Sequence, residues 1–219
     1  MRYEIKYPLD KGQGFAFEQW FCESGRPFRE IYKPRQVNTI SFDLPDLDSY
    51  SDNLAGLSNR SKLRLRWYGK ELLPSKAVFE IKAKKNSIGT KDLIEVDLSN
   101  YIWNDWATLM RQFRRDIPDQ LRPVRALLEF PQVLTSYERE YFSDDSGVRL
   151  TIDRKLTACS VQKFKDLTAR RMAGIPISVI VELKFAVEQR GYANTILKSL
   201  PFRPSKFSKY VSSIDRAFP

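Results

Sequence analysis

The chain has 219 residues, of which 42% are hydrophobic and 29% are charged, a composition typical of a globular protein. Its 37 Lys and Arg outnumber its 27 Asp and Glu, and the formal net charge of +10 favours an anionic partner. The chain contains no histidine, which excludes Ser-His-Asp and Cys-His catalysis in their usual form, and also His-ligated zinc.

The cysteines and the hydropathy pattern indicate the compartment. Cys22 and Cys159 have no CxxC spacing, so we interpret them as free thiols of a reducing compartment, with a disulfide between them as the alternative. The first residues, MRYEIKYPLD, contain no apolar core of a secretory signal, and no run approaches the length of a membrane-spanning helix. We therefore expect a cytoplasmic protein without a membrane span.

Six segments alternate charged and apolar residues with the period of two that is typical of a β-strand. In chain order they are RYEIKY (2–7), SKLRLRWY (61–68), AVFEIKAK (77–84), SYEREYF (136–142), GVRLTID (147–153) and SVIVELKF (178–185). In the second segment, Lys62, Arg64 and Arg66 share one face. Because neighbouring cations repel one another, we expect Arg64 and Arg66 to serve an anionic ligand and not the fold. Residues 37–44 and 92–98 are expected to form two further strands.

Helices are predicted at residues 46–54, 104–115 and 191–200. A last helix is expected to start at Ser205, which follows Pro204 and is a suitable N-cap. Residues 161–173 fit either a helix or a loop. We find no internal repeat and no low-complexity linker, so we predict a single domain over residues 1–219.

The alternating segments allow two arrangements of an antiparallel sheet. One is an ordinary sheet with one solvated face. The other, favoured by so many charged faces together, is an α+β fold in which the sheet curls into a barrel with the charges inside and short helices over its apolar outer face. A cationic lumen of this kind suits a dense polyanion such as a phosphate chain, because Arg binds phosphate oxygens in bidentate fashion and Lys acts as a point charge.

The order of motifs resembles the VTC domain, the catalytic module of vacuolar transporter chaperone polyphosphate polymerases. The similarity runs through RYEIKY, TISFDLPDLDSYSDNLAGLSNRSKLRLRWYG, FEIKAKKN, SYEREYF, GVRLTID, VELKF and SKFSKYV, and it spans nearly the whole chain. That family belongs to the triphosphate tunnel metalloenzymes, also called CYTH-like proteins. The resemblance implies an antiparallel barrel of about eight strands that forms a basic tunnel.

The resemblance also implies a set of site residues. The basic positions implied as catalytic are Arg64, Arg66, Lys82, Arg139 and Arg149. Those implied or inferred as substrate-binding are Lys6, Tyr137, Lys184, Lys206, Ser208 and Lys209. Glu182 matches the metal-binding glutamate of the family, and the implied cofactor is Mn²⁺ or Mg²⁺. Lys206 and Lys209 are expected to share one helix face, close to a helix N-terminus that favours phosphate.

The activity implied by the resemblance is transfer of the γ-phosphoryl group of ATP to a growing inorganic polyphosphate chain. The superfamily pattern Glu-x-Glu-x-Lys appears here as Arg2-x-Glu4-x-Lys6, which weakens a two-metal hydrolase and suits a transferase. A triphosphatase or polyphosphatase of the same fold and a non-catalytic polyphosphate-binding subunit are the alternatives. We expect nucleoside triphosphate and polyphosphate as ligands and no nucleic acid. Any role at the cytoplasmic face of a membrane is expected to need a separate membrane-protein partner.

Overall fold

The computed structural model describes residues 2–57, 60–71, 74–85, 88–101, 106–115, 119, 121, 127–161 and 172–218. Within these residues nine strands form one sheet, in the order β1-β9-β7-β6-β2-β3-β4-β5, and β8 pairs with β7. The strands are β1 (Arg2–Leu9), β2 (Arg29–Phe42), β3 (Arg60–Tyr68), β4 (Lys76–Lys85), β5 (Ile88–Asp97), β6 (Pro131–Ser143), β7 (Arg149–Ser160), β8 (Ala173–Gly174) and β9 (Val179–Ala186). The pairs β1–β9, β2–β3, β3–β4, β4–β5, β7–β8 and β7–β9 are all antiparallel.

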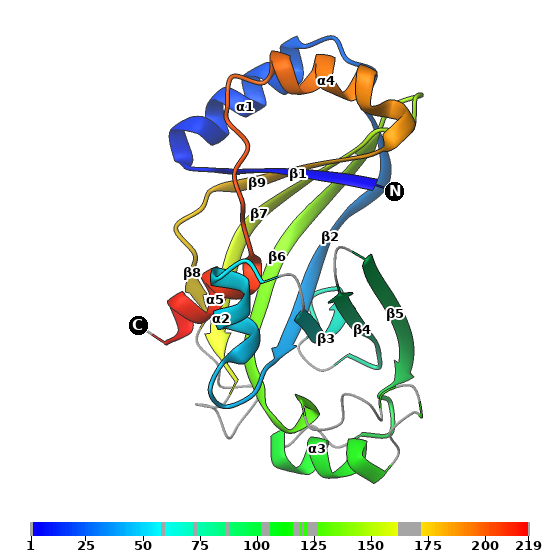
Figure 1. Ribbon diagram of the computed structural model, residues 1–219, viewed down its shortest axis with the longest axis vertical. Coiled ribbons are helices and arrows are strands. Elements are labelled where there is room, and N and C mark those ends of the chain that lie inside the picture. The colour runs from blue at the N-terminus through cyan, green and yellow to red at the C-terminus, as the bar shows by residue number, and fades with distance from the viewer. Residues whose placement is uncertain are drawn as a thin grey trace. The chain divides into compact units, whose positions relative to one another are not determined.

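Five α-helices accompany the sheet in the described part of the chain (Figure 1). They are α1 (Lys11–Glu23), α2 (Asp48–Leu54), α3 (Trp106–Arg115), α4 (Arg190–Ser199) and α5 (Lys209–Ala217). Short 3₁₀ helices lie at η2 (Leu127–Glu129) and η3 (Val187–Gln189). No helix among the described residues has the length and the apolar character needed to cross a membrane.

The chain forms two compact units, each assembled from segments that are far apart in sequence. Unit 1 contains Met1–Gln36, Tyr137–Leu156 and Ile175–Phe207, and unit 2 contains Val37–Ser136, Thr157–Gly174 and Ser208–Pro219. Strands β2, β6 and β7 contribute residues to both units. The single domain predicted over residues 1–219 stays a prediction.

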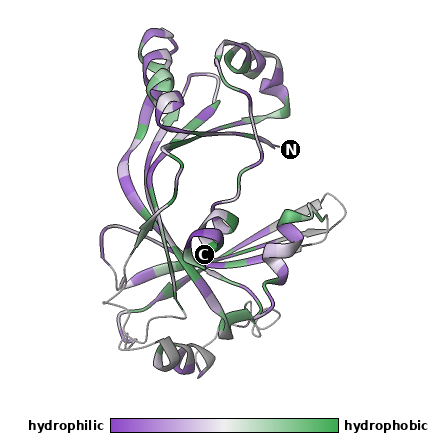
Figure 2. Ribbon diagram, turned by 90° about the vertical axis from the view of Figure 1, so that its left-hand side faces the viewer, coloured by the Kyte–Doolittle hydropathy of each residue, from purple (hydrophilic) through white to green (hydrophobic). Residues whose placement is uncertain are grey.

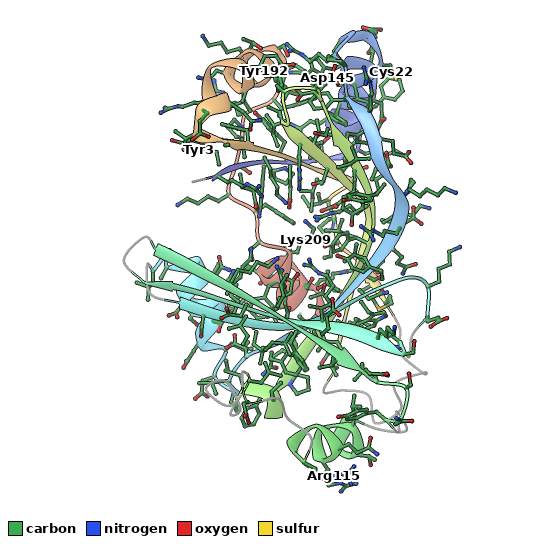
Figure 3. The ribbon with its side chains drawn as sticks, turned by 90° about the vertical axis from the view of Figure 1, so that its right-hand side faces the viewer. Tyr3, Cys22, Arg115, Asp145, Tyr192 and Lys209 are labelled. Carbon is green, nitrogen blue, oxygen red and sulfur yellow. The ribbon has the colours of Figure 1, made fainter. Side chains whose placement is uncertain are left out.

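The apolar face of the unit 1 strands is covered by α1 and α4. Both helices lie on the same side of β1 and β9 (Figure 1), and both carry hydrophilic and hydrophobic segments (Figure 2). Phe17 of α1 and Ile196 of α4 are fully buried among the strand residues Tyr7, Leu150 and Leu183. At the edge of this core the rings of Tyr3, labelled in Figure 3, and Phe185 lie 5.3 Å apart. The predicted helical cover of the apolar face is therefore present in unit 1.

Helix α1 was not predicted from the sequence. Its segment, KGQGFAFEQWFCE, contains two glycines, which weaken the helical signal. The helix nevertheless begins with a capping box: the Asp10 side chain accepts a hydrogen bond from the Gln13 backbone N–H at 2.8 Å, and the Gln13 side chain accepts one from the Asp10 backbone N–H at 3.2 Å. Because this pair satisfies two otherwise unbonded N–H groups, it fixes the start of the helix.

The apolar side chains that alternate along β3 and β4 form the core of unit 2. Leu63, Leu65 and Trp67 of β3 and Phe79 of β4 are buried together with Leu109 of α3.

Helices α2 and α5 are joined through the buried carboxylate of Asp43. It accepts hydrogen bonds from the backbone N–H of Leu44, before α2, at 2.9 Å, and from those of Ser49 and Tyr50, in the first turn of α2, at 2.9 Å and 3.0 Å. It also accepts one from the Tyr210 hydroxyl of α5 at 2.5 Å, so a single carboxylate holds both helices.

The predicted fold class, an α+β fold on an antiparallel sheet with short helices, is confirmed. The six alternating segments lie in strands apart from Gly147, Val148 and Ser178, and strand β2 is longer than predicted because it begins at Arg29. The prediction that Ser205 caps the last helix is wrong. Helix α5 begins at Lys209 with Ser208 as its N-cap, while the Ser205 backbone N–H donates to the Lys6 carbonyl of β1 at 3.0 Å. The prediction for 161–173 falls mostly outside the described residues, apart from Val161 and the residues from Met172 onward.

Candidate functional site

The charged residues that alternate along β1, β9 and β7 lie on one face of the sheet in unit 1. In the strand register, Lys6 and Thr151 lie on either side of Glu182, and Glu4 and Arg149 lie on either side of Lys184. Directly opposed residues of an antiparallel pair point to the same side of the sheet. We call this the Glu182 face, and its residues are Glu4, Lys6, Arg139, Arg149, Thr151, Asp153, Glu182 and Lys184.

Glu182 is buried at the centre of this face, with 4% of the residue exposed. Its carboxylate lies 2.9 Å from the Lys184 ammonium, 3.7 Å from the Arg139 guanidinium and 4.0 Å from the Lys6 ammonium. A second acid, Glu4, lies 3.0 Å from Lys6 and 3.7 Å from Lys184. Burial opposes ionisation of Glu4, but the attraction of Lys184 and Lys6 outweighs it and holds the pKa of that carboxyl below its usual value. Glu4 is therefore kept charged by the two lysines.

Arg139 is fixed by a bidentate ion pair with Asp153. Its Nε donates to Asp153 Oδ1 at 2.5 Å and its Nη2 to Asp153 Oδ2 at 2.7 Å, and Asp153 is fully buried. Burial opposes the charge on Arg139, whereas Tyr137, Asp153 and Glu182 favour it and raise the pKa well above its usual value. The guanidinium also lies over the Tyr137 ring, with its carbon 5.2 Å from the ring centre. Arg139 thus carries a permanent charge in a fixed position.

The other predicted residues of unit 1 differ in how they are held. Arg149 is exposed, and in the register it lies opposite Lys184. The Lys6 ammonium donates to the Phe207 carbonyl at 3.3 Å, which ties the segment before α5 to β1. Lys206 is exposed in this irregular segment and lies outside the helix. The predicted common helix face of Lys206 and Lys209 is therefore wrong.

The charged residues that alternate along β3 and β4 form a second polar face, in unit 2. Here Arg64 lies opposite Glu80 in the register, and Ser41 and Thr39 of β2 lie opposite Arg64 and Arg66. We call this the Glu80 face, and its residues are Thr39, Ser41, Lys62, Arg64, Arg66, Glu80, Lys82 and Lys91.

Glu80 is the buried acid of the second face, with 4% of the residue exposed. Its carboxylate accepts from Arg64 Nε at 2.6 Å and from Arg66 Nη1 at 2.9 Å, and it lies 3.7 Å from the Lys91 ammonium. Burial opposes its ionisation, but Arg64, Arg66 and Lys91 together lower its pKa. Arg64 and Arg66 therefore contribute to the internal ion pairs of unit 2, which corrects the expectation that they serve a ligand and not the fold.

A row of like charges crosses the same face. Lys62 lies opposite Lys82 across β3 and β4, and Lys82 lies opposite Lys91 across β4 and β5. Like charges that face each other directly across strands are destabilising. An anion bound along this row would relieve that repulsion, so the row favours an anionic ligand.

Ser208 and Lys209 lie at the start of α5, where Figure 3 labels Lys209. The Ser208 hydroxyl accepts a hydrogen bond from Asn53 Nδ2 at 3.1 Å and another from the Val211 backbone N–H at 3.5 Å. Its hydroxyl oxygen therefore caps the helix and contacts α2. Any hydrogen bond from Ser208 to a phosphate would come in addition to this structural role.

The donor set of the Glu182 face fits a divalent metal that arrives with phosphate. Among the described residues, no three Asp, Glu or Cys side chains cluster as a ready-made metal site. Mg²⁺ and similar ions are, however, commonly bound by one or two protein carboxylates together with phosphate oxygens and water. The Thr151 hydroxyl, opposite Glu182, is buried and has no hydrogen-bond partner among the described residues. This leaves an oxygen beside Glu182 for a ligand or a metal-bound water.

Sequence reasoning did not assign three acids of these faces: Glu4, Glu80 and Asp153. Each has the same strand parity as a predicted basic residue, Lys6, Lys82 and Arg149 respectively, and this signal was available in the sequence. Which cation each acid pairs with follows from the register of neighbouring strands, which the alternation alone does not give.

Known structures resemble this chain in fold. HpAC1 from Hippeastrum, described as a candidate adenylyl cyclase with a dominant triphosphatase activity, has a TM-score of 0.57 and 17% sequence identity over 100% of this chain and 98% of that chain. A candidate adenylate cyclase from Vibrio parahaemolyticus has a TM-score of 0.48 and 9% identity over 96% of each chain. The PH1819 protein from Pyrococcus horikoshii has a TM-score of 0.46 and 16% identity over 97% of this chain and 94% of that chain. At these identities the likeness to HpAC1 concerns the fold alone.

Comparison with curated protein sequences finds no match. The profile of the VTC domain, in contrast, matches residues 3–218. The match includes every residue of both polar faces and of the segment that leads into α5. The chain therefore belongs to the VTC domain family.

Proposed function

We propose that this chain is a polyphosphate polymerase that transfers the γ-phosphoryl group of ATP to the end of a growing inorganic polyphosphate chain. The observation that carries the proposal is the Glu80 face of a VTC domain, where Lys62, Lys82 and Lys91 face one another in a row. Cations that are directly opposed across strands repel one another, and an anion bound along the row would lower that repulsion. A phosphate chain offers negative charges at regular spacing along its length, which suits the row better than a single carboxylate does.

The chemistry of the proposed reaction needs no histidine. An ionised oxygen of the terminal phosphate attacks the γ-phosphorus, the bond from that phosphorus to the β–γ bridging oxygen breaks, and ADP leaves. The nucleophile is already deprotonated, so catalysis depends on alignment and on neutralising the phosphoryl oxygens. We assign this neutralisation to Arg64, Arg66 and Lys82 in unit 2 and to Arg139 and Arg149 in unit 1.

The remaining residues of the proposal hold the substrate and the metal. Lys6 and Lys184 flank Glu182 and would donate to phosphate oxygens, while Tyr137 supports the Arg139 guanidinium. Lys206, Ser208 and Lys209 are proposed to bind further along the phosphate chain. Mn²⁺ or Mg²⁺ would be held by Glu182 together with phosphate oxygens, and when bound it would neutralise part of their charge.

A triphosphatase is the second candidate, because HpAC1, which shares the fold, is described as having a dominant triphosphatase activity. In that reaction water takes the place of the chain end and orthophosphate is released. A polyphosphate-binding subunit without turnover is the third reading of the same residues. For any of the three, we propose that the protein acts in the cytoplasm and that a membrane role depends on a separate membrane-protein partner.

One incubation separates these functions. Purified protein is given ATP and Mn²⁺, and the products are measured as long-chain polyphosphate on a gel and as free orthophosphate. Polyphosphate is the expected product. Orthophosphate alone would show a triphosphatase instead of a polymerase, and tight polyphosphate binding without turnover would show a binding subunit.

The variant Arg66→Ala should abolish turnover. Its matched control is Arg216→Ala, which removes an exposed arginine of α5 outside both faces and should leave turnover intact.

A further inference from the structure

A ladder of alternating aromatic rings and guanidinium groups extends from the Glu182 face to the surface of unit 1. Arg139, which contacts Glu182, lies with its guanidinium carbon 5.9 Å from the centre of the Tyr141 ring. The Tyr141 ring is 5.7 Å from the Tyr32 ring of β2, which it meets edge to face. Arg35 lies over both rings, 4.9 Å from Tyr141 and 5.3 Å from Tyr32.

Tyr32, at the end of this ladder, is largely exposed to solvent. It is 56% exposed, although it contacts both Tyr141 and Arg35. Large aromatic side chains mostly bury much of their surface, because that burial is their main contribution to stability. A tyrosine that is held in place on one side and open to solvent over more than half of its surface offers a flat apolar platform for another ring.

The neighbourhood of the platform selects the kind of ring. The ladder contains two guanidinium groups, those of Arg35 and Arg139. A ligand that carries negative charge beside its aromatic ring is therefore attracted to this neighbourhood more strongly than a neutral one. Only two contacts, Tyr32 to Tyr141 and Tyr141 to Arg139, separate the platform from the residue that pairs with Glu182. A nucleoside triphosphate has this form: a flat base at one end and a chain of anionic phosphates at the other.

We infer that Tyr32 is a stacking platform for the base of the nucleoside triphosphate that donates the phosphoryl group, with Arg35 fixing the Tyr32 and Tyr141 rings. The inference rests on the proposed function, which supplies the nucleotide as substrate. Stacking on an aromatic side chain tolerates every base but is stronger for larger rings. The platform therefore favours purine over pyrimidine nucleotides and gives the site a preference for ATP over inorganic triphosphate.

The test compares two ligands that share the triphosphate and differ in the base. ATP and inorganic tripolyphosphate are titrated by calorimetry into the full chain in the presence of EDTA, so that no turnover occurs. Tyr32→Ala should weaken ATP binding by about tenfold, the usual magnitude of one base–aromatic stack, and leave tripolyphosphate binding unchanged. Tyr32→Phe keeps the ring and should bind ATP as the wild type does. In the wild type ATP should also bind more tightly than CTP, and Tyr32→Ala should remove this difference.

The controls separate stacking from a general loss of structure. Phe15→Ala removes another exposed aromatic side chain of unit 1, on α1 and 75% exposed, and should change neither affinity. Tyr32→Leu keeps apolar bulk without the aromatic face and should behave like Tyr32→Ala, which covers the case in which the alanine variant fails to fold. Equal losses for both ligands in Tyr32→Ala, or no loss for either, would overturn the platform.

The outcome also distinguishes this inference from the proposed function. If long-chain polyphosphate forms but Tyr32→Ala binds ATP normally, the platform is wrong and the polymerase stands. If the stacking effect is measured but no polyphosphate forms, the platform stands and the polymerase is wrong. If the wild type binds neither ligand, both are overturned.

Discussion

The two polar faces share one arrangement of charged side chains but differ in their ratio of basic to acidic groups. Each has one buried glutamate, Glu182 in unit 1 and Glu80 in unit 2, that meets three basic side chains within 4.0 Å. In unit 1 two more acids, Glu4 and Asp153, pair with the same basic residues. In unit 2, Arg64, Arg66 and Lys91 all pair with Glu80. Positive charge is therefore largely compensated in unit 1 and in excess on the Glu80 face.

This difference separates two ways of using basic residues. A buried cation with its own carboxylate is held in one position, because moving either partner would leave a charge without compensation. Several cations that share one carboxylate keep a net positive charge that an incoming anion can neutralise. We therefore expect changes to the acids of unit 1 to act mainly on stability, and changes to Glu80 to act on stability and on phosphate binding.

The largest expected effect is at Asp153. Asp153→Asn removes the charge that compensates Arg139, whose side chain is 12% exposed, so stability to urea should fall by about 3–5 kcal/mol. Asp145→Asn is the matched control, because Asp145 pairs with Arg29 at the surface, where both side chains are mostly exposed. Its effect should stay within about 1 kcal/mol. Equal effects of the two variants would show that the Arg139–Asp153 pair does not anchor the Glu182 face.

A smaller loss of stability, with a gain in binding, is expected for Glu80→Gln. Arg64 and Arg66 are 30% and 14% exposed, so solvent compensates part of the lost charge, and the loss should be about 1–3 kcal/mol. Tripolyphosphate should bind roughly tenfold more tightly, because a competing negative charge has been removed from the face. Urea unfolding and calorimetric titration measure the two effects. Weaker tripolyphosphate binding would show that Glu80 positions the arginines and does not compete with the ligand.

The acid side of the pH–stability profile should depend on both faces. Glu4 and Glu80 have pKa values below the ordinary value of 4.5, so the unfolded chain binds more protons than the folded chain near that pH. Their stabilising contribution is present above about pH 4.5 and is lost as the pH falls through the lower folded values. Melting temperatures between pH 3 and pH 7 should therefore fall less steeply for Glu80→Gln than for the wild type. If the melting temperatures of the two proteins fall in parallel, the protonation of Glu80 does not contribute to the loss of stability at acid pH.

The smallest expected effect tests what Ser208 does in unit 2. Ser208→Ala removes the N-cap of α5 and the contact with Asn53, so stability should fall by about 1 kcal/mol. Ser212→Ala, a substitution inside the same helix, should be neutral or slightly stabilising because alanine favours helices. Tripolyphosphate affinity is measured for both variants. A loss of affinity in Ser208→Ala alone would add phosphate binding to the capping role, and unchanged stability would contradict the cap.

The sequence was most informative where the signal is local. Alternation in RYEIKY, SKLRLRWY and SVIVELKF places residues on faces because successive strand side chains point to opposite sides. The structure has these segments as strands, apart from Ser178. The helix over residues 11–23 was missed because its apolar pattern is interrupted by glycine, although Asp10 and Gln13 carry a capping signal. The start of α5 was placed too early because Ser205 and Ser208 are both suitable caps. Only the hydrogen bond from the Ser205 backbone to Lys6 of a distant strand separates them.

By itself the sequence determined the strand faces, the surplus of positive charge, the absence of histidine chemistry and the family. Tertiary structure decided which charges meet. Arg139 pairs with Asp153, fourteen positions away on the next strand, and Arg64 pairs with Glu80 on β4. Shifting either register by one residue would move a whole set of side chains to the opposite face, and register is set by packing of the buried apolar faces and not by the charged residues themselves. The same non-local packing brought Tyr32 of β2 against Tyr141 of β6, a contact that no periodicity in either segment predicts.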